Sequence, residues 1–144
     1  MEPLDLTRRP PRSPREKLLD CYFLPRTIDK MRAELPGGNP GKYFVLNTRS
    51  ISGYVLHKLK IDADAMRALV AQAKDEDEVV AWLRERIDPA TVREVNEKIS
   101  AMRVDKLDAE GEALIYKYHP EMRERSDVLT TFDLLEADDA RAFA

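Results

Sequence analysis

The sequence has a single cysteine and no long apolar run, and both shortages exclude classes of protein. One cysteine cannot form an internal disulfide, which favours the cytoplasm over an oxidising compartment. No stretch approaches the roughly 20 apolar residues that a membrane-spanning helix needs. Residues 1–12 contain paired arginines without an apolar segment after them, so they do not resemble an export signal. We therefore expect a cytoplasmic protein that does not cross a membrane.

Motifs for metal or cofactor binding are equally scarce. His57, His119 and Cys21 stand far apart, without the paired spacing of a zinc motif. Segment 36–42 is rich in glycine, but Pro36 stands where a Walker loop needs glycine. Cys21 lies in the apolar stretch D-C-Y-F-L, which predicts a buried, unreactive thiol. The sequence therefore predicts no cofactor and no metal site, leaves any catalytic residue unknown, and favours a protein that is not an enzyme.

What is present indicates a small helical domain. The 144 residues are 43% hydrophobic and 35% charged, enough to bury one core. From residue 50 onward apolar residues recur at helical spacing, and several helices begin behind an aspartate that suits an N-cap. These aspartates are Asp62, Asp75 and Asp88. We predict an all-α fold of seven or eight short helices with at most one minor strand, at 43–46. An extended, basic, proline-rich arm over 1–12 precedes a single helical domain over 13–144.

The segment after the arm carries two competing signals. Ser13 and Glu16 have the spacing of a capping box, and Pro14 suits the first helical turn, which together predict a helix over 14–22. Pro11 and Pro14 also form a P-x-x-P motif, which aromatic-lined grooves bind in partner proteins. We favour the helix, because two independent local signals agree on it.

The segment 24–35, L-P-R-T-I-D-K-M-R-A-E-L, has the clearest helical pattern and anchors the predicted fold. Its apolar residues fall on one narrow stripe. They are Leu24, Ile28, Met31 and Leu35. Arg26 and Lys30 lie on the opposite face, where they can pair along the helix with Asp29 and Glu34. We predict a short helix that docks by one thin edge and exposes a charged back.

The last third of the chain predicts two further helices with acidic surroundings. Over 107–118 the pattern directs Leu114, Ile115 and Tyr118 inward, and His119 before a proline ends the helix. Several carboxylates follow near the C-terminus, which we interpret as a solvated acidic surface. They are Asp133, Glu136, Asp138 and Asp139.

Cations near the glycine-rich loop form the one candidate binding site. The predicted anion site consists of Arg26, Lys30, Lys42 and Arg49. Loop amides would add donors for a phosphate or carboxylate, and Tyr54 and His57 form a neighbouring candidate pocket. The alternative is ordinary pairing of these cations with carboxylates, which we favour. Nucleic acid is disfavoured, because the chain is acidic overall and its helix-turn-helix-like pair would point 75–78, D-E-D-E, at phosphates.

Three segments carry a resemblance to a known family: D-L-T-R-R-P-P-R-S-P-R, L-P-R-T-I-D-K-M-R-A-E-L and T-T-F-D-L-L-E-A-D-D. In this order they resemble the bacterial family known as domain of unknown function 5069. The resemblance implies a small bacterial protein of one domain and carries no activity, substrate or cofactor.

Two functional hypotheses remain. The first is a non-catalytic protein interaction module, a homo-oligomer or a subunit of an assembly, which binds through the stripe of 24–35 and nearby aromatic residues. These aromatic residues are Tyr22, Phe23, Tyr43, Phe44 and Trp82. The second is a protein or enzyme that binds a small anionic ligand in the basic region around the loop.

Overall fold

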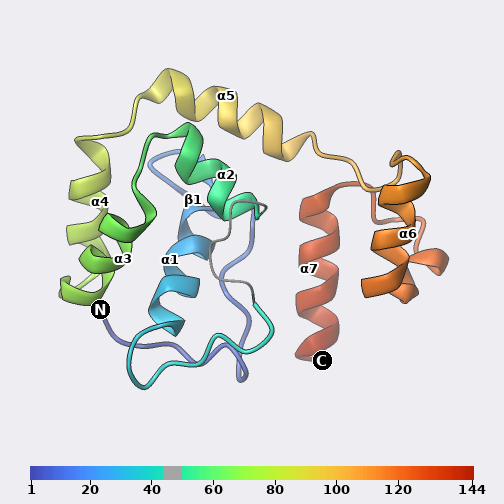
Figure 1. The fold of residues 1–144 in the computed structure, drawn as a ribbon, viewed down its shortest axis with the longest axis horizontal. Helices are drawn as coiled ribbons and strands as arrows, with labels where there is room; N and C mark the ends of the chain where they lie inside the picture. The colour runs from blue at the N-terminus through green and yellow to red at the C-terminus, as the bar shows by residue number, and fades with distance from the viewer. Residues whose placement is uncertain (44–49) are drawn as a thin grey trace. The chain divides into compact units, whose positions relative to one another are not determined.

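The computed structural model describes residues 1–43 and 50–144, which divide into two compact units, Met1–Asn96 and Glu97–Ala144 (Figure 1). The described residues form seven α-helices, one short 3₁₀-helix and one two-stranded sheet. The predicted helical fold class is therefore confirmed. The strand predicted at 43–46 lies, after Tyr43, outside the described residues, and the single domain over 13–144 stays a prediction.

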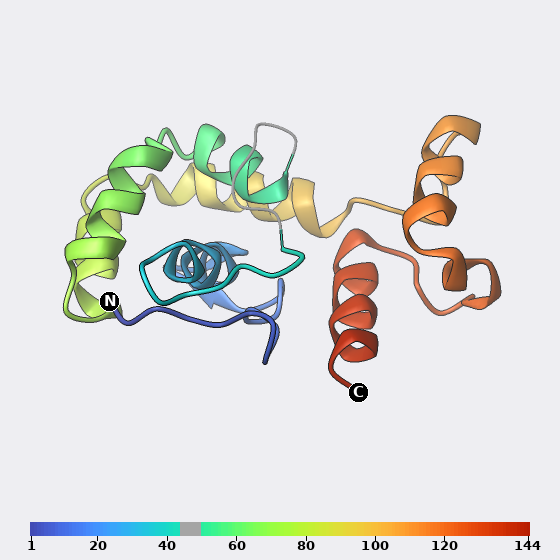
Figure 2. The ribbon, with the colours of Figure 1, turned by 60° about the horizontal axis from the view of Figure 1, so that its bottom comes forward.

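The first unit is built around α1 (Leu24–Ala33). The other elements of this unit are β1 (Lys17–Leu18), β2 (Cys21–Tyr22), α2 (Ile51–Lys58), α3 (Ala63–Gln72), α4 (Glu76–Arg84) and the first residues of α5 (Pro89–Ser100). Figure 2 shows α1 nearly end-on, with α3 and α4 to one side, α2 above it and the N-terminal segment below. The central helix is thus enclosed by elements from both sides of it in the sequence.

Nine of the ten residues of α1 are buried, including three of its four charged residues. Arg26 is 1% exposed, Asp29 2% and Lys30 7%. The prediction of an exposed charged back is therefore wrong. The reason is a long-range partner that helical periodicity does not reveal: Arg12 reaches Asp29 from the N-terminal segment, with its Nη2 at 3.0 Å from the Asp29 Oδ1.

Residues 1–12 pack against the first unit through backbone hydrogen bonds. The Leu6 N–H donates to the Asn39 carbonyl at 2.7 Å, and the Asn39 N–H donates to the Leu4 carbonyl at 2.9 Å. Leu6 is 1% exposed and belongs to the core. Pro11 and Pro14 are also buried, which removes the P-x-x-P motif from the surface.

The helix predicted over 14–22 is wrong, because this segment forms an antiparallel hairpin of β1 and β2. A single turn follows Ser13, whose carbonyl accepts the Glu16 N–H at 3.1 Å, and the chain then extends. Leu19 and Asp20 both adopt left-handed backbone angles, with φ of 51° and 61°. Two consecutive left-handed residues match the turn that closes a two-residue hairpin.

The helices that the sequence predicts behind Asp62, Asp75 and Asp88 begin at these aspartates. The Asp62 carboxylate accepts the Asp64 N–H at 2.8 Å, and the Asp75 carboxylate accepts the Glu78 N–H at 3.2 Å. Asp88 likewise accepts the Ala90 N–H at 3.1 Å at the start of α5. These bonds satisfy donors that a helix N-terminus otherwise leaves unpaired.

The second unit contains the end of α5, α6 (Ala109–Tyr118), the 3₁₀-helix η1 (Pro120–Glu124) and α7 (Thr131–Ala142). A capping box between Thr130 and Asp133 begins α7. The small core of this unit contains Met122, Val128 and Leu134, with Val104, Ile115, Tyr116 and Ala137 packed against it. Leu114 and Tyr118 were predicted to face inward, but they are 52% and 66% exposed. Of the described residues of α6, Ile115 and Tyr116 are the ones packed against this core.

Candidate ligand-binding site

The described residues of the predicted anion site differ in their exposure to solvent. Arg26 and Lys30 are buried on α1, whereas Lys42 is exposed in the glycine-rich loop. Arg49 lies outside the described residues. On α2, Tyr54 is half-buried and His57 is exposed.

The two buried cations of α1 lie close to aromatic rings. The Arg26 guanidinium is 5.9 Å from the centre of the Phe23 ring and 5.5 Å from that of Tyr43. The Lys30 Nζ is 5.4 Å from the Phe23 ring centre. Such contacts stabilise a cation that has left water. Arg26 also donates from Nη1 to the Arg12 carbonyl at 3.1 Å. These contacts tie α1 to its neighbours, and an anion site at these residues stays a prediction.

A cluster of three charged side chains, of which only Asp29 is fully buried, joins three segments of the first unit. Arg12 donates to the Asp29 carboxylate on α1 and, from Nη1, to Glu76 Oε2 on α4 at 3.2 Å. Burial alone would lower the pKa of Arg12, but the hydrogen bonds to Glu76 and Asp29 raise it above its ordinary value. The guanidinium therefore stays charged, and its bonds to Asp29 and Glu76 stabilise the fold.

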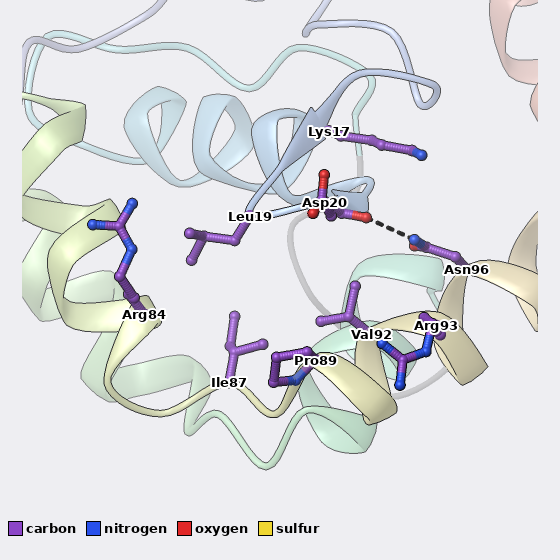
Figure 3. A pocket seen from close by; sticks show the side chains of 9 residues that line it. All are labelled: Lys17, Leu19, Asp20, Arg84, Ile87, Pro89, Val92, Arg93 and Asn96. Atoms are coloured by element: carbon purple, nitrogen blue, oxygen red, sulfur yellow. Dashed lines mark hydrogen bonds between the residues drawn. The ribbon is translucent and has the colours of Figure 1, made fainter.

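A cavity of about 490 Å³ opens where the β1–β2 turn faces the corner between α4 and α5 (Figure 3). It is lined by Lys17, Leu19, Asp20, Arg84, Ile87, Pro89, Val92, Arg93 and Asn96. Its volume falls in the range of about 300–1,000 Å³ that small-molecule sites occupy. None of the described residues of the predicted anion site lines it.

The cavity combines an apolar floor with a cationic rim. The floor consists of Leu19, Ile87, Pro89 and Val92. In Figure 3, Arg84 lies on one side of these apolar residues, and Lys17 and Arg93 lie on the other. Both arginines are exposed, and neither has an ion pair or hydrogen bond with any residue that the structure describes. Asp20 is the single acidic side chain of the lining, so positive charge exceeds negative charge at the rim.

Comparison with known proteins places the chain in a family. A family model described as "Domain of unknown function (DUF5069)" matches residues 8–141. The chain belongs to the DUF5069 family. The resemblance found in the sequence is thereby confirmed, and the match includes parts of both units of this DUF5069 protein. No curated protein matches the chain at a significant level.

In this DUF5069 protein, Asn96 fixes the geometry of the cavity wall. Its Oδ1 accepts the Tyr22 N–H at 3.0 Å, and its Nδ2 donates to the Asp20 carbonyl at 2.7 Å. One side chain of α5 thus holds the end of the β1–β2 turn and the strand β2 that follows it, as the dashed line in Figure 3 shows for Asp20. The wall is preformed, which lowers the entropic cost of binding a ligand.

Two further sequence predictions concern the reactivity of Cys21 and the expectation that no helix spans a membrane. Cys21 is 0% exposed, as predicted, and burial raises the pKa of its thiol to about 12, so the thiolate is scarce at neutral pH. Among the described residues, every helix is too short or too polar to span a bilayer. Sequence reasoning missed Arg84 and Arg93, because their site is completed by a hairpin that the local signals predicted as a helix.

Proposed function

We propose that this DUF5069 protein is a non-catalytic binding module whose ligand is a small amphipathic anion. The observation that carries the proposal is the rim of the 490 Å³ cavity, where Arg84 and Arg93 have no ionic partner among the described residues. An anionic head group would pair with these guanidinium groups, and its apolar part would cover Leu19 and Val92.

The free energies expected for these contacts predict a modest affinity for the anion. Burying about 100 Å² of apolar ligand surface contributes about 2.5 kcal/mol. Hydrogen bonds from charged guanidinium groups contribute about 1.5–3 kcal/mol each. Association costs and the surface position of the arginines offset part of this gain, so we expect a Kd between about 10 µM and 1 mM.

The described residues that line the cavity are suited to binding a ligand and lack the groups that catalysis needs. The nine described side chains include no histidine, cysteine, serine or threonine, and their single carboxylate, Asp20, has no second acid or base beside it. General acid–base and nucleophilic catalysis both need such a group within hydrogen-bond reach of a substrate. We therefore propose a carrier, sensor or regulatory domain in a bacterial cytoplasm, a setting that the free, buried thiol of Cys21 supports.

The proposal is tested by calorimetric titration with octanoate and with octanamide, which has the same chain and no charge. We expect octanoate to bind and octanamide to bind at least tenfold more weakly, because only the carboxylate pairs with the rim. The variant Arg93→Ala should weaken octanoate binding by about tenfold, whereas Lys98→Ala, an exposed cation on the same helix outside the cavity, should not change it. Equal binding of acid and amide, or equal affinity in both variants, would refute an anion site here.

A second candidate function, self-association, rests on a different surface. The expected contact stripe cannot serve as a contact surface, because its residues Leu24, Ile28 and Met31 are only 0–1% exposed. The exposed Leu114 and Tyr118, one turn apart on α6, offer an alternative apolar contact for a second copy of the chain. Sedimentation velocity across a concentration series tests it, and a monomer at every concentration would exclude it.

A further inference from the structure

A histidine and two carboxylates converge in the second unit. His119 follows the end of α6, Glu121 lies in η1, and Asp138 belongs to α7. One ligand atom of each lies within 4.8 Å of one from each of the others. The His119 Nδ1 is 3.8 Å from the Glu121 Oε1 and 3.5 Å from the Asp138 Oδ1. Three different elements thus direct metal-ligating atoms at one point.

One ligand atom of the cluster, in the neutral form of its side chain, is buried without an ion pair or a hydrogen bond in the described part of the chain. The His119 Nδ1 and the Glu121 Oε1 are both inaccessible to solvent and form no hydrogen bond within the described residues, but the Glu121 Oε1 has Arg141 as an ion-pair partner. A buried polar atom without a hydrogen bond destabilises the fold, and a bound ion would remove that cost. The His119 Nδ1 therefore points to a ligand at the place where the three side chains converge.

Arg141 is the competing explanation for the carboxylates. Its Nε is 3.1 Å from the Glu121 Oε1, and its Nη2 donates to the Asp138 Oδ1 at 2.9 Å. One guanidinium neutralises only one of the two carboxylates, so the cluster keeps a negative charge when His119 is neutral. The arginine pairing also leaves the His119 Nδ1 unexplained, because this nitrogen faces the carboxylates and not the guanidinium.

We propose that His119, Glu121 and Asp138 bind a divalent first-row transition-metal ion through one nitrogen and two oxygens. Tetrahedral zinc, with bonds of about 2.0–2.2 Å, separates its ligand atoms by about 3.3–3.6 Å. The two distances from the His119 Nδ1, 3.5 and 3.8 Å, are close to this value. A mixed imidazole and carboxylate set suits Zn²⁺ or Mn²⁺ and leaves a further position for water. The ion displaces Arg141 from at least one carboxylate.

The test is a calorimetric titration of the metal-stripped full chain with Zn²⁺ alone. We expect one Zn²⁺ per chain in the wild type, and weakening of about tenfold or more in His119→Ala and in Glu121→Gln. Glu121→Gln preserves the size of the side chain, so it still reports on the site if His119→Ala fails to fold. The matched control is His57→Ala, which removes the second of the two histidines from an exposed position on α2 and should bind normally.

Arg141→Ala separates a metal site from an ion-pair network. If the arginine competes with the metal, its removal tightens Zn²⁺ binding. The proposal is overturned if the wild type binds no Zn²⁺, if Glu121→Gln binds as the wild type does, if His57→Ala abolishes binding, or if Arg141→Ala leaves affinity unchanged or lower.

Discussion

Replacing Asp29 with alanine is expected to destabilise the first unit strongly. Asp29 is 2% exposed, and its carboxylate accepts hydrogen bonds from three donor groups of Arg12. These come from the backbone N–H at 2.8 Å, from Nε at 3.1 Å and from Nη2 at 3.0 Å. The substitution leaves the Arg12 N–H without its acceptor and removes the ion pair between the N-terminal segment and α1.

The expected loss in the free energy of unfolding follows from the burial and the partners of the Arg12–Asp29 pair. Removing one partner of a buried ion pair costs about 3–5 kcal/mol. Arg12 keeps Glu76 as a partner and is itself partly exposed, so the guanidinium is not stranded. We therefore expect a loss near the lower limit, about 3 kcal/mol in the free energy of unfolding. For a chain of this size that corresponds to a fall of roughly 6–12 °C in Tm.

Urea unfolding monitored by circular dichroism measures the loss, with Asp64→Ala as the matched control. Asp64 also pairs with an arginine, Arg67, at 3.2 Å, but its carboxylate is 92% exposed. Such a surface pair contributes less than about 1 kcal/mol. If Asp29→Ala loses no more stability than Asp64→Ala, the buried pair does not hold the N-terminal segment on α1, and the explanation of the buried charges on this helix fails.

Three further predictions concern other parts of the chain. Leu19→Val should destabilise by about 1–2 kcal/mol in urea, because a β-branched residue disfavours the left-handed angle that position 19 adopts; an unchanged midpoint would contradict the turn. Thr130→Ala should cost about 1 kcal/mol through the lost capping box of α7, whereas Thr130→Ser should retain most of it. The raised pKa of Cys21, about 12 against an ordinary 9.0, means that the unfolded chain releases its thiol proton first. Stability should therefore fall by about 1 kcal/mol between pH 8.5 and 10 relative to Cys21→Ala, and parallel pH profiles would refute this.

The sequence correctly predicted the helix starts that depend on one aspartate. Asp62, Asp75 and Asp88 cap their helices as expected, because an N-cap hydrogen bond spans only two or three residues. The hairpin was missed because its turn has no local sequence signal and is held by a distant residue. Leu19 and Asp20 lack the Asn-Gly or Asp-Gly pair that marks such a turn, and Asn96, which holds it, is 76 positions from Asp20.

Contacts between distant segments account for the other errors. Periodicity placed the charges of α1 on a solvent face, but Asp29 is buried against Arg12, 17 positions earlier in the chain, and Arg26 is buried against Tyr43, 17 positions later. Both candidate sites likewise consist of residues that are distant in the sequence and meet only in the folded chain. The cavity needs the hairpin beside α4 and α5, and His119 meets Asp138 only after α7 has folded back onto the end of α6. Such pairings carry no signature in a single sequence.

An NMR titration of the ¹⁵N-labelled chain with octanoate tests the central claim most directly, because it locates the ligand. We predict chemical-shift changes at the backbone amides of 17–20 and 84–96, with loss of these changes in Arg93→Ala. Changes centred instead on α2, around Tyr54 and His57, or no changes at millimolar octanoate, would contradict the assignment of the cavity as an anion-binding site.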